Sequence, residues 1–180
     1  MIRNKKKLSI LICSITERAR SLNNLLSSLE RQSTDEVEIL VEVDNRAMRI
    51  GEKRNLLLGK ATGDYICYID DDDSVTQDYI PTIINAIKSK PDCCGIKGKI
   101  YRRGHMNVFI HSIRYKSWYS EGKIYYRCPN HLNPVKRELA LQVGFPTCNH
   151  GEDKTYSMKL LPLLQKEVFI PKVMYFYRTR

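Results

Sequence analysis

The chain of 180 residues has a size typical of one domain. Hydrophobic residues make up 42% of it, which is enough for a packed core and excludes a wholly disordered chain. The formal net charge of +10 favours an anionic partner, such as a nucleotide, a nucleic acid or an acidic membrane surface. Composition alone does not separate these partners from a charge that only keeps the protein soluble.

The cysteine pattern and the apolar segments exclude two further classes. None of the six cysteines forms a Cys-x-x-Cys pair, so a zinc site is poorly supported. No stretch approaches the ~20 apolar residues that a membrane span needs. The apolar run at residues 8–15 follows three lysines but leads to no small-residue cleavage site. We expect a soluble cytoplasmic protein without a transmembrane segment, and leave peripheral contact with a membrane open.

Strand and helix patterns alternate through the first half. Three apolar runs predict buried strands: residues 8–14, 37–43 and 65–69. Apolar residues at helical spacing predict three helices: residues 22–29, 51–60 and 79–87. Leu56 and Leu57 are expected on the apolar face of the second helix, and Thr16 is a candidate N-cap for the first. This alternation predicts βαβ units and a parallel sheet, whose ligands collect at the carboxyl ends of its strands.

The second half has a different pattern. Residues 95–127 are rich in Tyr, Ile, Arg and Lys with loose alternation, which predicts a hairpin or mixed strands. Two helices and two short strands are expected after them: helices at 134–143 and 152–164, strands at 168–170 and 173–177. No linker or repeat divides the chain, so we expect one α/β domain over residues 1–180, with a smaller mixed β region in its second half.

An aspartate run, residues 70–73, is the strongest local signal. Four adjacent carboxylates after an apolar strand repel one another, and a divalent cation such as Mn2+ or Mg2+ would remove that repulsion. The alternative is a solvated acidic turn that caps the next helix, where negative charge is also favourable.

The order of these segments resembles family 2 glycosyltransferases. The matching segments of the first half are the strands at 9–16 and 37–44, Gly-Glu-Lys-Arg-Asn at 51–55, Ala-Thr-Gly-Asp-Tyr-Ile at 61–66 and the aspartate run. Those of the second half are Asn-Pro-Val-Lys at 133–136, Gly-Phe-Pro at 144–146 and Gly-Glu-Asp at 151–153. The resemblance implies a GT-A-like, Rossmann-type, mostly parallel sheet flanked by helices.

The same resemblance implies an inverting, metal-dependent glycosyltransferase. It would move a sugar from a nucleotide-sugar donor, with a UDP-sugar expected, to a hydroxyl of a glycan or another acceptor. Residues up to about 100 would bind the donor, and residues from about 101 to 180 the acceptor. Because the sequence ends at residue 180 without a long acceptor domain, processive polymer synthesis is not expected.

The resemblance assigns the donor site first to the aspartate run and to Asp44. Asp70-Asp71-Asp72 matches the DxD motif: Asp72 would bind the metal directly, Asp70 would help through water or the ribose, and Asp73 would orient them or cap the helix. Asp44 would accept a hydrogen bond from the uracil N–H, or else form an ordinary turn with Asn45.

Other candidates flank this site. Thr16 and Glu17 lie where the family touches the nucleotide, or else they cap a helix. Lys53 and Arg54 are candidates for the diphosphate or the nucleobase, and their alternative is a solvated basic helix face.

The resemblance assigns catalysis to Asp153, the expected general base, with Glu152 as its neighbour. A carboxylate there would remove the acceptor proton as the hydroxyl attacks the anomeric carbon. The alternative is acidity typical of a helix N-terminus. The family's histidine metal ligand is missing from the final strand, and His131 and His150 are either substitutes or structural.

Two other classes compete with this interpretation. A nucleotidyltransferase of related architecture would need a glycine-rich loop after the first strand, and residues 13–20 contain no glycine. A basic nucleic-acid-binding module would use residues 5–7, the pair at 102–103 and the tyrosine-rich middle. It leaves the aspartate run unexplained, so no nucleic acid partner is expected.

Overall fold

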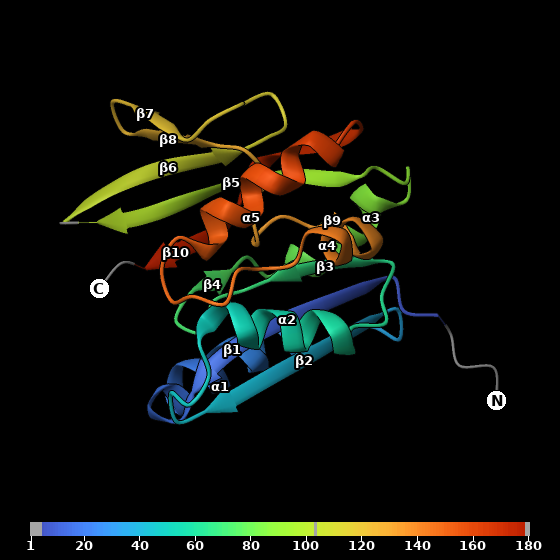
Figure 1. Ribbon diagram of the computed structural model, residues 1–180, viewed down its shortest axis with the longest axis vertical. Helices are drawn as coiled ribbons and strands as arrows, with labels where there is room; N and C mark the ends of the chain where they lie inside the picture. The colour runs from blue at the N-terminus through green and yellow to red at the C-terminus, as the bar shows by residue number, and fades with distance from the viewer. Residues whose placement is uncertain (1–4, 103, 179–180) are drawn as a thin grey trace.

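The computed structural model describes residues 5–102 and 104–178, and its elements follow the expected order (Figure 1). The first half contains β1 (Leu8–Ile15), the 3-10 helix η1 (Thr16–Arg18), α1 (Ala19–Glu30), β2 (Val37–Asp44), α2 (Ile50–Lys60), β3 (Tyr65–Tyr68), β4 (Ser74–Val75) and α3 (Tyr79–Ile87). The second half contains β5 (Cys93–Arg102), β6 (His105–His111), β7 (Tyr119–Glu121), β8 (Ile124–Arg127), β9 (Val135–Lys136), α4 (Arg137–Val143), α5 (Glu152–Leu160), the 3-10 helix η2 (Leu161–Leu163) and β10 (Glu167–Arg178).

One mixed sheet joins the two halves. Its order is β2-β1-β3-β9-β5-β6-β8-β7, and β10 pairs with β4 and β5. The pairs β1–β2 and β1–β3 are parallel, as the strand–helix alternation predicts, and place the carboxyl ends of β1 and β2 side by side at Ile15 and Asp44. The β5–β6 pair is an antiparallel hairpin, which confirms the mixed region expected at residues 95–127.

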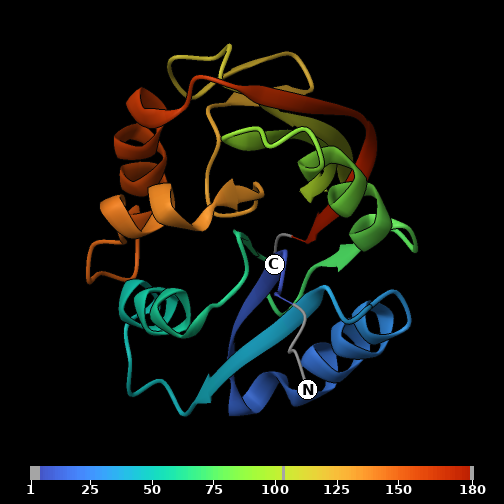
Figure 2. The same ribbon diagram turned by 90° about the vertical axis from the view of Figure 1, so that its right-hand side faces the viewer.

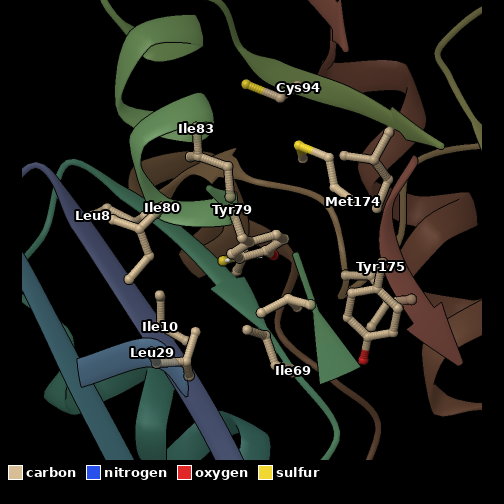
Figure 3. Packing of buried hydrophobic residues seen from close by; sticks show 14 of the residues in the cluster. Leu8, Ile10, Leu29, Ile69, Tyr79, Ile80, Ile83, Cys94, Met174 and Tyr175 are labelled. Carbon is tan, nitrogen blue, oxygen red and sulfur yellow. Dashed lines mark hydrogen bonds between the residues drawn. The ribbon is translucent and has the colours of Figure 1, made fainter. Parts of the chain in front are cut away.

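Helices cover both faces of this sheet and enclose two apolar cores. Figure 2 shows α1 and α3 on one face and α2, α4 and α5 on the other. On the first face, Leu29 and Ile83 pack with Leu8 and Ile10 of β1 (Figure 3). On the second face, α2 and α5 pack against Leu11 of β1. The strand β1 is therefore buried on both sides, which explains its continuous apolar sequence.

Four local expectations are wrong. Leu56 is exposed, and Leu57 and Leu58 form the apolar face of α2 instead. The predicted helix at 134–143 begins only at Arg137, because β9 precedes it. The two final strands are one strand, β10, with register shifts between residues 169 and 175 around Pro171. Thr16 caps no helix, since its hydroxyl donates to the Glu17 carboxylate. No helix in the described part of the chain is long and apolar enough to cross a membrane.

The N-terminal half of α2 packs directly on the loop between α4 and α5. A Cβ on Gly51 would lie 1.8 Å from the carbonyl oxygen of Pro146, so only glycine fits there. One turn later, the Asn55 side chain donates to the Phe145 carbonyl and accepts from the Phe145 amide, both at 2.8 Å. These contacts fix the start of α5 relative to α2. They thereby help to set the distance between two acidic motifs, the aspartate run at 70–73 and the Glu152-Asp153 pair.

We therefore predict that Gly51→Ala lowers the free energy of unfolding by roughly 1–3 kcal/mol, because the methyl group forces α2 away from this loop. Gly59→Ala in the same helix is the matched control. Its Cβ would meet nothing within 4 Å, so it should stabilise by about 0.4–1 kcal/mol through the unfolded chain. Urea denaturation of both variants checks this, and equal effects at both positions would contradict the close packing.

Candidate active site

The aspartate run leaves the carboxyl end of β3, and its side chains diverge. Asp71 is 1% exposed, and its oxygens are held at 2.6 Å by the Ser14 hydroxyl and by the Arg18 guanidinium. Asp73 accepts from the Tyr175 hydroxyl at 2.6 Å and from the Arg178 amide at 2.8 Å. These two aspartates face the protein interior, and α3 begins only at Tyr79. The alternative of a solvated, helix-capping turn is therefore wrong for both.

The other two aspartates are only partly buried. Asp70 lies 3.4 Å from Nη2 of Arg54 and 3.6 Å from Nε2 of His131. Asp72 lies 3.5 Å from the Arg18 guanidinium, and its side chain is 21% exposed. The run thus alternates between the partly buried side chains of Asp70 and Asp72 and the buried side chains of Asp71 and Asp73.

Different surroundings shift the pKa values of Asp70 and Asp73 in opposite directions. Burial raises the pKa of Asp70, but His131 and Arg54 lower it by more. The pKa of Asp70 therefore lies well below the usual range of an aspartate, and its carboxylate stays ionised. Burial and the negative charge of Asp70 raise the pKa of Asp73 to about 8. Asp70 therefore carries the fixed negative charge of the run, and Asp73 serves mainly as a hydrogen-bond partner of β10.

Arg54 joins the two acidic motifs. It projects from α2, is 4% exposed, and its Nη1 donates to Oε1 of Glu152 at 2.7 Å while Nη2 faces Asp70. Its guanidinium also lies over the rings of Tyr68 and Phe145, at 5.8 and 5.4 Å from their centroids. A planar fork can hold two carboxylates in this way and a lysine cannot. The alternative of a solvated basic helix face is wrong for Arg54.

Lys53 and Asp44 form a second buried ion pair. The ammonium of Lys53, which is 3% exposed, pairs with Oδ1 of Asp44 and donates to the Ser14 carbonyl at 2.7 Å. The amide of Met48 donates to the other oxygen of Asp44 at 2.7 Å. The hydrogen bond from Lys53 lowers the pKa of Asp44. Lys53 is thus not on a solvated face either, and Asp44 is ionised and fixed at the end of β2.

Thr16 and Glu17 lie at the exposed start of η1, where Glu17 pairs with Arg46 at 3.1 Å. They follow the carboxyl end of β1, next to Asp44 on β2. Their position at this edge agrees with the expected sheet topology.

A cavity of about 570 Å³ gathers part of the predicted site. Asp70, Arg54, Glu152 and Asp153 line it, together with His131 and His150. The other candidates are not among its lining residues: Thr16, Glu17, Asp44, Lys53, Asp71 and Asp72. Two halves of the chain thus meet here, with the end of β3 facing the start of α5. Gly151 permits this start, because it precedes α5 with a φ of 77°.

The two histidines differ in their surroundings. His131 is 5% exposed, and neither of its ring nitrogens has a hydrogen-bond partner in the described residues, which is unusual for a buried polar group. His150 is exposed. No three side chains of His, Cys, Asp and Glu in residues 5–102 and 104–178 form a ready metal-binding group.

Three residues with clear roles here were not predicted from the sequence. Arg18 neutralises Asp71. The sequence feature that could have indicated this role is a basic residue just after the first strand. Tyr175 donates to Asp73 and accepts from the Asp70 amide at 3.2 Å. Arg127 lines the cavity from β8. No local pattern marks the last two, because their partners lie far away in the sequence.

Solved structures define the class of fold. The structure titled S. aureus TarS 1-349 in complex with UDP-GlcNAc superposes with a TM-score of 0.76 at 17% identity, over 97% of this chain and 59% of that one. The mannosyltransferase PcManGT from Pyrobaculum calidifontis, in complex with GDP-Man and Mn2+, gives a TM-score of 0.63 at 15% identity, over 96% of this chain and 56% of that one. The expected GT-A-like α/β fold is confirmed. The chain spans less than two thirds of either structure.

Residues 44–149 match the family model described as Glycosyl transferase family 2. The match covers more than half of the chain, and the chain therefore belongs to glycosyl transferase family 2. No curated protein sequence matches the chain significantly.

Proposed function

We propose that this protein is an inverting glycosyltransferase that moves a sugar from a nucleotide-sugar to an acceptor hydroxyl. The observation that carries the proposal is the single cavity in which Asp70, at the end of β3, faces Asp153, at the start of α5. Family membership supports it, as do the nucleotide-sugars bound by the structures of similar fold, UDP-GlcNAc in one and GDP-Man in the other. No observation favours the nucleotidyltransferase alternative.

Asp153 is the proposed general base. It lines the cavity, is partly exposed, and forms no ion pair in the described part of the chain, so it can accept a proton. It would take the proton of the acceptor hydroxyl while that oxygen forms a bond to the anomeric carbon and the nucleoside diphosphate leaves. Glu152 is committed to Arg54, and we propose that it positions Asp153 rather than moving a proton itself.

Asp72 and Asp70 are the proposed ligands of Mn2+ or Mg2+. Ionised carboxylates are the hard donors that these cations prefer, and such cations are commonly bound by one or two carboxylates plus substrate phosphates. The fixed charge of Asp70 and the partial exposure of Asp72 fit this donor set. When bound, the cation would neutralise charge on the leaving diphosphate. Asp71 would position Asp72 through their shared partner Arg18.

The donor nucleotide is proposed to be UDP. Asp44 is ionised, and each carboxylate oxygen can accept a second hydrogen bond beyond those from Lys53 and Met48. Uracil offers an N–H to such an acceptor. Lys53 would thereby act on the nucleobase through Asp44, and Thr16 and Glu17 would touch the nucleotide beside it. The cytoplasmic location expected from the sequence stays a prediction.

The proposed base is tested with Asp153→Asn. Release of the nucleoside diphosphate, UDP from UDP-sugars and GDP from GDP-sugars, is measured with Mn2+ and should fall by about 100- to 10,000-fold, because loss of a general base typically has this effect. UDP binding, measured by calorimetry, should not change. Glu138→Gln is the control, an acid in the first turn of α4 that is absent from the cavity. An Asp153→Asn enzyme with the wild-type rate would place the base elsewhere.

The proposed metal ligand is tested with Asp72→Asn, which keeps the side chain's size and removes its charge. Wild type should bind UDP more tightly with Mn2+ than without it, and the variant should lose this gain while its thermal unfolding is unchanged. Titration of each protein with UDP, with Mn2+ or with EDTA, measures the difference. Equal UDP affinity of the two proteins in the presence of Mn2+ would refute the assignment.

A further inference from the structure

Two arginines, Arg102 of β5 and Arg127 of β8, lie on the wall of the cavity that β5, β6 and β8 contribute. Between residues 95 and 136 the sequence has lysine or arginine at nine positions and one acidic residue, Glu121. A second cavity, of about 420 Å³, shares Arg102 and Tyr125 with the first and is also lined by Lys123. A continuous basic surface therefore leads from Asp153 outward over the β5–β6 hairpin.

Arg127 is held in a fixed position on this surface. Its Nη1 donates to the carbonyls of Tyr119 and Tyr126 at 2.6 and 2.8 Å, and its guanidinium lies 5.0 Å from the Trp118 ring centroid. These contacts leave Nε and Nη2 without a hydrogen-bond partner in the described residues, and the side chain lines the cavity. The guanidinium is thus oriented before any ligand arrives.

These cations differ from the other basic residues of the site in forming no ion pair with a carboxylate. Arg18, Lys53 and Arg54 each pair with a carboxylate. In contrast, no ion pair in residues 5–102 and 104–178 involves Arg102, Lys123 or Arg127. The Arg127 guanidinium is half-buried, and the charge of Asp153 offsets this burial only in part, so a bound anion would stabilise it. The basic surface therefore favours an anionic ligand.

The position of this surface identifies which substrate carries the anion. The donor's diphosphate belongs beside Asp70 and Asp72 if the proposed function holds. Arg102 and Lys123 lie in the second cavity, none of whose lining residues comes from β1, β2 or β3. Asp153, the proposed base, shares the first cavity with Arg127 and Arg102. Asp70 lines that first cavity as well, so the assignment of the anion depends on the second cavity. An anion held between Arg102 and Lys123 lies away from β1, β2 and β3, and we assign it to the molecule that carries the attacked hydroxyl.

Resting on the proposed function, we infer that the acceptor is an anionic polyhydroxyl chain that carries phosphate or carboxylate groups. Arg127 binds the charged group next to the attacked hydroxyl, and Arg102 and Lys123 bind the following one. A guanidinium pairs with either group through two parallel hydrogen bonds, so the chemistry of recognition is shared and the two sources are separated by experiment.

The test measures binding, so that it is independent of turnover. Four fluorescent probes of equal length are titrated against the protein: a neutral maltooligosaccharide, its phosphorylated form, an oligogalacturonate and a single-stranded DNA. Wild type should bind at least one charged oligosaccharide about tenfold more tightly than the neutral one, and the tighter of the two identifies phosphate or carboxylate.

The variant Arg102→Gln/Lys123→Gln changes two exposed side chains and should lose about tenfold in that affinity, with unchanged thermal unfolding. The control Arg20→Gln/Arg31→Gln removes the same charge from exposed positions on and just after α1 and should bind like wild type. Equal loss in both variants, or equal affinity of wild type for neutral and charged oligosaccharides, overturns the inference. So does tighter binding of DNA than of either oligosaccharide.

Failure of this inference is distinguishable from failure of the proposed function. Wild-type turnover of a UDP- or GDP-sugar without any preference for charged oligosaccharides overturns the inference alone. Charge-dependent binding of the oligosaccharides without turnover of any donor overturns the proposed function, and with it the identification of the bound chain as an acceptor.

Discussion

The ion pairs of Arg54 hold the two halves of the site together. Its guanidinium reaches Glu152 on one side and Asp70 on the other, while the rings of Tyr68 and Phe145 surround it. Each acid would be unfavourable in this buried position alone, and the arginine would be unfavourable without them. The close fit of Gly51 and Asn55 against residues 145–146 keeps α2 at the distance that this arrangement needs.

Four adjacent aspartates are tolerated because each has a different partner. Asp71 is neutralised by Arg18, Asp70 by Arg54, and Asp73 is protonated over a wide pH range because its pKa is raised to about 8. The hydrogen bond from Tyr175 to Asp73 also connects the run to the last strand. The same geometry leaves Asp70 and Asp72 partly exposed, so the residues with structural partners alternate with the proposed metal ligands along one loop.

The sequence predicted the parts of the fold that rest on long, regular patterns. The strands and helices from β1 to α3 are long enough for periodicity to show them, whereas β4 and β9, of two residues each, are not. Two final strands were expected on either side of Pro171, but the structure accommodates this proline in the irregular register of the single strand β10. Arg54, Asp70, Glu152 and Asp153 were named from local motifs. Arg54 and Glu152 are 98 residues apart in the sequence. The link that Arg54 makes between Asp70 and Glu152 therefore depends on tertiary packing, which no local pattern encodes.

The central claim is that Arg54 is a buried link between two acidic motifs, and a double-mutant cycle in urea tests it most directly. Arg54→Met should lower the free energy of unfolding by about 3–5 kcal/mol, because it leaves two buried carboxylates unpaired. Adding Glu152→Met should restore part of this loss, since one of the unpaired charges is removed. An Arg54→Met effect within about 0.5 kcal/mol of zero, as expected for a surface position, or strictly additive effects of the two substitutions, would contradict the account.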